Sequence, residues 1–195
     1  DGKPHINVLN SDGRRWSFFT DGKAAGGTGT LAGSNTGNWF GDIPSPGFIS
    51  IGKHTQGSGK PGGNPYKGSF GEILVYDHPL AAAERATLQE YFERKYAGKP
   101  AGPVEPPREG LRYWLDASDL DADPASANPA SGTPVSSWKD RITGLELVQA
   151  DAGLQPRVSS LGAGAPGVDF DGDFMLGSSR GASFLGDQAG AIVSI

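Results

Sequence analysis

Aromatic and amide side chains in glycine-rich loops are the residues of this chain best suited to bind a ligand. Trp39 and Tyr66 lie in or beside two such loops. Asn38 directly precedes Trp39, and Asn64 stands two residues before Tyr66. An aromatic face stacks on the apolar C–H patches of a sugar, while nearby polar groups hydrogen-bond its hydroxyls. We therefore predict these four as ligand-binding residues for a carbohydrate, although a loop tryptophan such as Trp39 can equally be buried to pin its loop.

Patterns typical of catalysis are weak in this sequence. Glycoside hydrolysis requires two carboxylates about 5 to 10 Å apart, and no run of alternating acids occurs on one predicted strand. Glu72 and Asp77 are five residues apart, which places them on opposite faces of a regular strand. We interpret Glu72 as an acidic residue on an edge strand and Asp77 as an acidic residue in a turn. The histidines His5, His54 and His78 stand in no Ser-His-Asp or nucleophile-elbow motif, so the chain is predicted not to be an enzyme.

Calcium is the one metal that the acidic residues suggest. Asp169, Asp171 and Asp173 alternate along the chain, and a second acidic cluster spans residues 116 to 121. Carboxylate oxygens are ligands that Ca²⁺ prefers. The alternation also has a simpler interpretation, in which Asp171 and Gly172 form a turn and the flanking acids stay hydrated. Both interpretations stay open, and no other cofactor is predicted.

Composition favours a β-rich globular protein. The chain has 195 residues, of which 36% are hydrophobic, with 31 glycines and 15 prolines that suit short strands joined by tight turns. The net charge is −5, with 17 basic and 22 acidic residues and no basic stripe, which argues against nucleic acid as a partner. Without cysteine there is no disulfide or thiolate metal site. No apolar run approaches the roughly 18 residues that span a bilayer, so membrane insertion is not expected.

The hydrophobic periodicity predicts one helix among many short strands. Leu88, Phe92 and Tyr96 recur at helical spacing within residues 81–96, and Gly98 is the expected C-cap. The predicted strands cover residues 5–9, 14–20, 48–52, 70–76, 111–117, 135–140, 145–150, 166–170, 174–177 and 191–195.

The tryptophans that fall inside these strands are predicted core residues. They are Trp16, Trp114 and Trp138. The glycine-rich segments 24–47 and 56–65 are predicted loops, the usual place for binding residues on a β-scaffold.

A proline-rich segment divides the chain. Residues 99–109 contain four prolines and form a predicted stiff linker between residues 1–98 and 110–195. The strand-then-helix pattern comes before this linker, and a fresh series of strands follows it.

Motifs on both sides of the linker resemble the LamG-like jelly rolls of the concanavalin A-like lectin/glucanase superfamily. The first half is similar to how these modules end, and the second half is similar to how they begin. The resemblance rests on Trp16-Ser-Phe-Phe-Thr-Asp-Gly22, Phe48-Ile-Ser-Ile-Gly52, Tyr66-Lys-Gly-Ser-Phe-Gly-Glu-Ile-Leu-Val-Tyr-Asp-His-Pro-Leu80, Leu111-Arg-Tyr-Trp-Leu-Asp-Ala-Ser-Asp119, Val135-Ser-Ser-Trp-Lys-Asp140 and Val168-Asp-Phe-Asp-Gly-Asp173.

The resemblance implies an all-β, two-sheet antiparallel jelly-roll sandwich that is circularly permuted. The C-terminal half of one module (1–98) would pair with the N-terminal half of the next (110–195) in one sandwich, because the ends of such modules lie close together. It also implies a noncatalytic carbohydrate-recognition or adhesion module, a monomer within the tandem array of a longer extracellular, bacterial protein. A structural spacer without a ligand is the alternative, and a glycoside hydrolase is a third, because a fold does not define a function.

Overall fold

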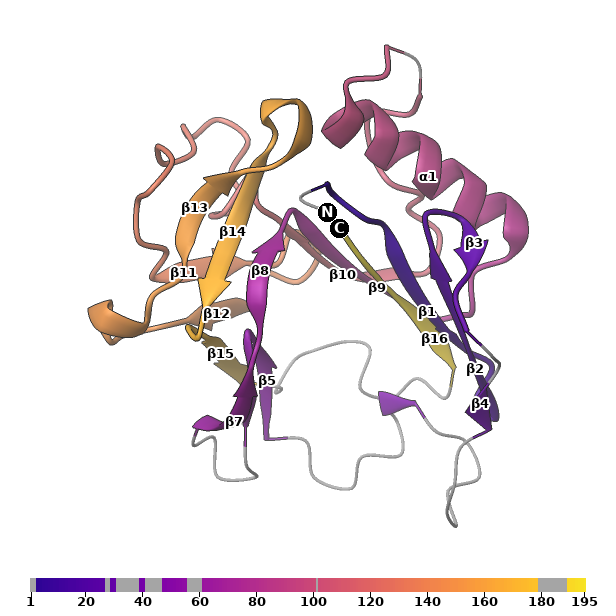
Figure 1. Ribbon diagram of the computed structural model, residues 1–195, viewed down its shortest axis with the longest axis horizontal. Helices are drawn as coiled ribbons and strands as arrows, with labels where there is room; N and C mark the ends of the chain where they lie inside the picture. The colour runs from indigo at the N-terminus through magenta and orange to yellow at the C-terminus, as the bar shows by residue number, and fades with distance from the viewer. Residues whose placement is uncertain are drawn as a thin grey trace.

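The computed structural model describes residues 3–26, 29–30, 39–40, 47–55, 61–100, 102–178 and 189–195. In this part of the chain the protein is mostly β, with several antiparallel sheets and one α-helix. This content is consistent with an all-β sandwich. Figure 1 shows two sheet layers that lean against each other, with the helix across the outer side of one of them.

The larger layer, called sheet A, is an antiparallel sheet that includes both early and late strands. Its order is β10, β9, β16, β1, β2 and β3, and β4 also pairs with β2. The strands are β1 (Asn7–Ser11), β2 (Arg15–Thr20), β3 (Lys23–Ala24), β4 (Gly29–Thr30), β9 (Glu72–Tyr76), β10 (Leu111–Asp116) and β16 (Gly190–Ser194).

The second layer consists of smaller sheets. One has the order β11-β12-β15-β5, another β13-β14-β8, and β6 pairs with β7. The bounds are β5 (Phe48–Ile51), β6 (Lys53–Thr55), β7 (Pro61–Pro65), β8 (Lys67–Phe70), β11 (Ser137–Lys139), β12 (Glu146–Val148), β13 (Arg157–Ser160), β14 (Pro166–Asp171) and β15 (Met175–Ser178), with short 3-10 turns η2 (Ala152–Leu154) and η3 (Gly162–Gly164).

Strands from before and after the segment 99–109 share backbone ladders. In sheet A, β9 lies between β10 and β16, and β16 also pairs with β1. In the second layer β14 pairs with β8, and β15 pairs with β5. Separating residues 1–98 from residues 110–195 would therefore leave unpaired strand edges in both layers, which is costly for a folded protein.

Helix α1 (Ala82–Ala97) agrees with the predicted helix to within one residue at each end. Leu88 and Phe92 are fully buried on its inner face. A Glu84 carboxylate oxygen accepts a hydrogen bond from the Ala81 backbone N–H at 2.7 Å, satisfying one of the donors that a helix start leaves unpaired. Gly98 ends the helix in the left-handed conformation at φ 69°, which glycine adopts without strain.

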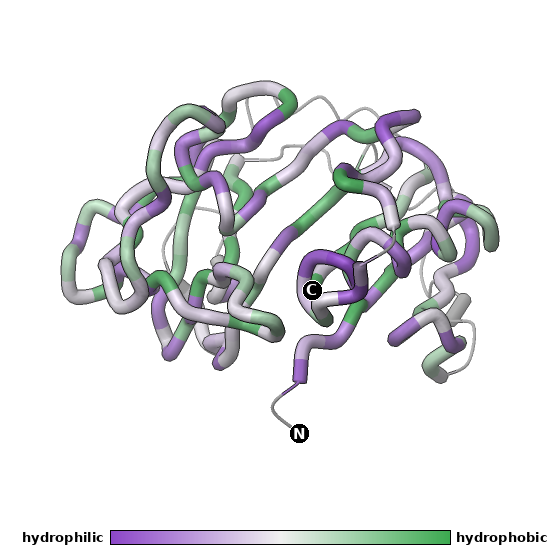
Figure 2. Tube along the Cα trace, turned by 90° about the horizontal axis from the view of Figure 1, so that it is seen from above, coloured by the Kyte–Doolittle hydropathy of each residue, from purple (hydrophilic) through white to green (hydrophobic). Residues whose placement is uncertain are grey.

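Sheet A separates two hydrophobic cores. The outer core lies between sheet A and α1, and the inner core lies between sheet A and the second layer. Because side chains alternate along a strand, β9 sends Leu74 and Tyr76 to the outer core and Ile73 and Val75 to the inner core. In Figure 2 the strands that cross the middle of the molecule carry the hydrophobic, green stretches.

The predicted core tryptophans are buried to different extents. Trp114 (1% exposed) belongs to the outer core and Trp138 (0%) to the inner core, as predicted. Trp16 on β2 is only partly buried.

Several local expectations were wrong. Residues 70–76 form two strands in different layers, since the chain crosses at Gly71, where a Cβ would lie 2.6 Å from the Tyr96 ring. The chain at Asp171 and Gly172 joins β14 to β15, which belong to different sheets. Part of the predicted loop 56–65 is strand β7, held by pairing with β6. Strand β13 was missed, because its four residues Arg157–Ser160 include only one large apolar side chain.

No helix in the described part of the chain is both long and apolar enough to cross a membrane.

Candidate functional site

A groove runs between the two layers, and we call it the interlayer groove. Its first part has a volume of about 640 Å³ and is bounded by the segment before β1, by β8, by η3 and by the end of β16. Its second part, about 440 Å³, is bounded by β5, β6, Asn64 and the inner face of sheet A. The two parts share Tyr66, Phe70 and Ser194, so they form one continuous depression. Residues of β8 and β16 line the first part, and Figure 1 shows these two strands in different layers.

Tyr66 occupies the middle of the interlayer groove. Its side chain is 41% exposed, and its ring stacks on Phe70 with a centroid distance of 4.6 Å and an interplanar angle of 21°. Phe70 in turn meets Phe170 of the inner core edge-on at 6.0 Å. This series of aromatic contacts fixes the Tyr66 ring while part of its surface faces the solvent. The ring is thus a preformed flat platform at the junction of β7 and β8.

Gly68 permits this placement of the tyrosine. Its φ of 145° is unfavourable for residues with a side chain, and a Cβ there would lie 2.9 Å from the Tyr66 hydroxyl oxygen. Burial, and then the nearby Asp169 carboxylate, raise the pKa of Tyr66 above its ordinary value. The hydroxyl therefore stays protonated at neutral pH and can both donate and accept hydrogen bonds.

Polar side chains surround the platform. Asn7, Ser69 and Ser194 line the first part of the groove, and Ser50 and Asn64 line the second. These hydroxyl and amide groups, next to a partly exposed aromatic ring, are the combination that recognises a polar ring compound with an apolar face.

Some of these hydroxyls already have fixed partners. Ser69 donates to Asp169 at 2.8 Å, and its oxygen lies 3.3 Å from the Ser159 hydroxyl. The Ser50 hydroxyl donates to the Lys53 carbonyl at 2.8 Å. A ligand would meet oriented oxygen atoms there, which increases the geometric selectivity of the groove.

The predicted ligand-binding residues do not all meet at this site. Tyr66 and Asn64 line the interlayer groove. Trp39 is only 8% exposed, belongs to the inner core and packs edge-on against Phe40 at 4.9 Å. Of the two interpretations of Trp39, its placement favours the buried one. Asn38 lies outside the described residues.

The three alternating aspartates of the calcium hypothesis bind different protein groups. Asp169 accepts from Ser69, Asp171 pairs with Lys67 at 2.5 Å, and Asp173 accepts the Asp171 backbone N–H at 3.1 Å. Among the described residues, no three acidic or histidine side chains are grouped in a way that could hold a metal ion. Nothing in this geometry supports the calcium hypothesis over the turn interpretation.

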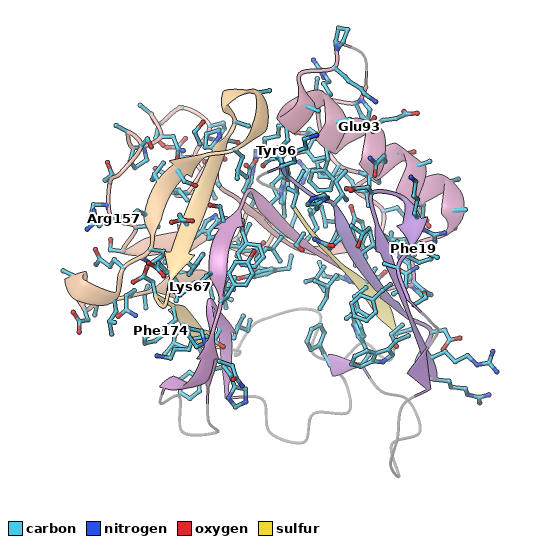
Figure 3. The ribbon with its side chains drawn as sticks, in the orientation of Figure 1. Phe19, Lys67, Glu93, Tyr96, Arg157 and Phe174 are labelled. Atoms are coloured by element: carbon cyan, nitrogen blue, oxygen red, sulfur yellow. The ribbon has the colours of Figure 1, made fainter. Side chains whose placement is uncertain are left out.

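The interpretation of Glu72 as an edge acid was wrong. Strand β9 is internal to sheet A, and the Glu72 side chain is fully buried beneath α1. Its carboxylate accepts hydrogen bonds from four donors: Trp114 Nε1 at 2.7 Å, Lys95 Nζ at 2.7 Å, Tyr91 Oη at 2.8 Å and Tyr96 Oη at 3.2 Å. Figure 3 shows Tyr96 beneath the helix, in the space between α1 and sheet A.

A second buried carboxylate completes this group, which we call the outer polar cluster: Glu72, Tyr91, Lys95, Tyr96, Trp114, Asp116 and Arg141. Lys95 Nζ lies 2.7 Å from both Glu72 and Asp116, and Arg141 pairs with Asp116 at 2.9 Å. Burial, and next the charge of Asp116, raise the pKa of Glu72 to about 7. Although burial opposes it, Lys95 and then Ser118 hold the pKa of Asp116 below its ordinary value.

A histidine links the end of β9 to the start of α1. His78 Nδ1 lies 2.9 Å from Asp77 and its Nε2 lies 2.8 Å from Glu84, so each ring nitrogen faces a carboxylate. The hydrogen bonds to Asp77 and then to Glu84 raise the pKa of His78. Asp77 also pairs with Arg112 at 2.7 Å. This arrangement anchors the start of the helix to the end of β9.

Sequence reasoning missed Phe70, Ser69 and Ser194 as site residues. One signal was available, because Tyr66 and Phe70 are four residues apart and so face the same side of an extended chain. Nothing in the local sequence marked Ser194 as a site residue, since its place beside Tyr66 depends on the pairing of β16 with β9 and β1.

No family model matches this chain, and the comparisons with curated proteins and with solved structures find no match either.

Proposed function

We propose that the protein is a noncatalytic carbohydrate-recognition or adhesion module that binds a glycan in the interlayer groove. The observation that carries this proposal is the Tyr66 ring, which is stacked on Phe70, 41% exposed and surrounded by hydroxyl and amide groups. Such a platform buries the C–H face of a sugar, while the polar groups bind its hydroxyls.

The positions of the carboxylates favour binding over hydrolysis. Glu72 and Asp116 are direct neighbours across β9 and β10, but both are buried on the outer face of sheet A beneath α1. They are on the other side of the sheet from the groove, and their oxygens are occupied by Lys95 and other donors. A glycosidase needs its two carboxyl groups on either side of the scissile bond, so a sugar in the groove could not reach this pair.

The finer architecture belongs to the same proposal. The β-rich layers and the sequence motifs support a LamG-like jelly roll of the concanavalin A-like superfamily, permuted so that residues 1–98 and 110–195 complete one sandwich. We propose that such a module acts as a monomer within the tandem array of a longer extracellular protein, at a bacterial cell surface. The shared ladders across residues 99–109 support the permuted arrangement.

Affinity electrophoresis in gels that contain soluble polysaccharides tests the proposal. The native protein should be retarded by at least one polysaccharide, and Tyr66→Ala should remove the retardation. Phe48→Ala is the matched control, because Phe48 is a similarly exposed aromatic (48%) on a neighbouring strand and does not line the groove. Retardation by no polysaccharide, with Tyr66→Ala behaving like the parent, would favour the spacer. Release of reducing sugar would instead show an enzyme.

A further inference from the structure

Basic residues line the interlayer groove on both sides of Tyr66. Lys3 and His5 border the first part, and Lys53 and His54 border the second. No Asp or Glu is among the described residues that line either part. The chain as a whole has more acidic than basic residues, 22 against 17. The groove therefore differs in charge from the average surface of the molecule.

Two carboxylates that contact residues of this lining, Asp21 and Asp169, are engaged by protein donors. Asp21 pairs with His5 at 2.8 Å and accepts the Ile6 backbone N–H at 3.0 Å. Asp169 accepts the Ser69 hydroxyl at 2.8 Å. Within the described residues Lys53 makes no ion pair, and its ammonium stands 5.9 Å from the Phe174 ring centroid. Its charge is thus available at the rim of the groove.

The order of these groups along the groove matters for the ligand. Lys3 lies in the first part and Lys53 in the second, while Tyr66 belongs to both. An aromatic platform thus has a lysine on each side. A chain of sugars that stacks one ring on the tyrosine would bring its neighbouring units toward the two ammonium groups. A polymer with a carboxylate on each unit matches this alternation of apolar face and positive charge.

We propose that the interlayer groove selects polysaccharides built from carboxylate-bearing sugars, such as uronic acids, over neutral glycans of the same backbone. This inference rests on the proposed function, because it requires a glycan to lie on Tyr66. The lysines act as point charges that attract the polymer and hold its carboxylates at the groove rim, an interaction that salt weakens.

Two pairs of polymers test the selectivity by changing charge while keeping the backbone. Affinity electrophoresis compares polygalacturonate with its methyl ester, and carboxymethyl cellulose with hydroxyethyl cellulose. The charged member of at least one pair should retard the native protein about tenfold more strongly than its neutral partner. The difference should shrink as NaCl is raised from about 0.05 M to about 0.5 M, where the screening length falls severalfold.

Substitutions separate the charge effect from the platform. Lys3→Gln and Lys53→Gln should each weaken the binding of the charged polymer severalfold more than the binding of its neutral partner. Lys139→Gln is the matched control, because Lys139 lies on β11 and does not line the groove. Melting temperatures of all three variants should match that of the parent, which separates a charge effect from misfolding.

The outcomes distinguish this inference from the proposed function. Equal retardation by both members of each pair, with loss of binding in Tyr66→Ala, would overturn the charge selectivity and leave glycan binding intact. A preference for the charged polymer that persists in the Lys3→Gln, Lys53→Gln double variant would also overturn it. Retardation by no polymer of either pair, nor by any other polysaccharide, would overturn both proposals.

Discussion

The two sides of sheet A differ in the exposure of their polar groups. On the outer face, the outer polar cluster buries two carboxylates and supplies donors to both from Lys95 and its neighbours. On the inner side, the groove between sheet A and the second layer leaves Tyr66 partly exposed next to several hydroxyl groups. Strand β9 contributes to both, with Glu72 outside and Ile73 inside. The outer polar cluster is closed off from solvent, whereas the groove on the inner side is open, which fits the binding role proposed for it.

Removing the central carboxylate should have the largest effect on stability. Glu72→Ala leaves the Trp114 indole N–H and the two tyrosine hydroxyls without their acceptor, and Lys95 with only Asp116. We expect a loss of about 3–5 kcal/mol in the free energy of unfolding, measured by urea denaturation. Glu90→Ala, at an exposed position of α1, is the control and should change it by less than about 0.5 kcal/mol. Similar values for the two variants would contradict a structural role for the outer polar cluster.

The raised pKa of Glu72 predicts a specific dependence of stability on pH. A folded-state pKa of about 7 against an ordinary 4.5 means that the folded protein binds this proton more tightly than the unfolded chain. Its contribution to stability is fully present below pH 4.5 and is lost as the pH rises through 7, an effect on the order of 3 kcal/mol.

A neutral isostere checks this contribution. Glu72→Gln should remove the decline between pH 4.5 and 7 in urea unfolding curves, whereas a decline of unchanged size would show that other groups cause it. The lowered pKa of Asp116 acts in the opposite direction, because its contribution is present above pH 3.8 and is lost on further acidification.

Gly68→Ala should perturb both stability and binding. A side chain at this φ is strained, and its Cβ would displace the Tyr66 ring from its place on Phe70. We expect a loss of about 1–3 kcal/mol in unfolding free energy, together with weaker retardation by polysaccharides. Gly63→Ala is the control, because a Cβ there meets no atom within 4 Å. Normal glycan binding by Gly68→Ala would show that the position of the Tyr66 ring is not required.

Tyr66→Ala should separate recognition from stability most clearly. The ring is 41% exposed and its main contact is Phe70, so its removal should cost about 1 kcal/mol in unfolding free energy. Glycan binding should nevertheless be lost. A large drop in melting temperature would mean that Tyr66 belongs to the core, and would weaken the contrast between the two faces.

The smallest effect is expected at His78, at the margin of the outer face. His78→Asn removes the link from Asp77 to Glu84, and the side chain is 33% exposed, so about 0.5 kcal/mol is expected. Because the pKa of His78 is raised, this contribution is present below pH 6.5 and is lost as the pH rises through the raised value. Thermal melts of parent and variant should therefore differ at pH 6 and converge at pH 9.

Local patterns in the sequence predicted much of the fold. The spacing of Leu88, Phe92 and Tyr96 defined α1, and period-two alternation located most of the strands. Gly71 shows where this reasoning failed, since residues 70–76 were predicted as one strand but cross there from one layer to the other. Alternation describes which faces are apolar, but it does not state to which sheet a residue belongs.

The candidate site was predicted only in part for the same reason. Tyr66 and Asn64 were found from their loop context, but Trp39 has the same context and packs into the inner core. The exposure of an aromatic residue depends on what packs over it, and this involves residues far away in the chain. Lys3 and Lys53 gave no signal, because each is an ordinary polar residue until the two parts of the groove come together.

By itself, the sequence determined the β-rich class, the amphipathic helix at residues 81–96 with its glycine cap, and the excess of acidic over basic residues, since these follow from composition and short-range periodicity. Only the tertiary structure decided that Glu72 is internal and surrounded by donors. It also decided that β9 lies between two strands from the other side of residues 99–109. It placed Tyr66 in a groove with Lys3 in one part and Lys53 in the other. Those features depend on strand pairing between distant segments, which side-chain alternation along a single strand does not encode.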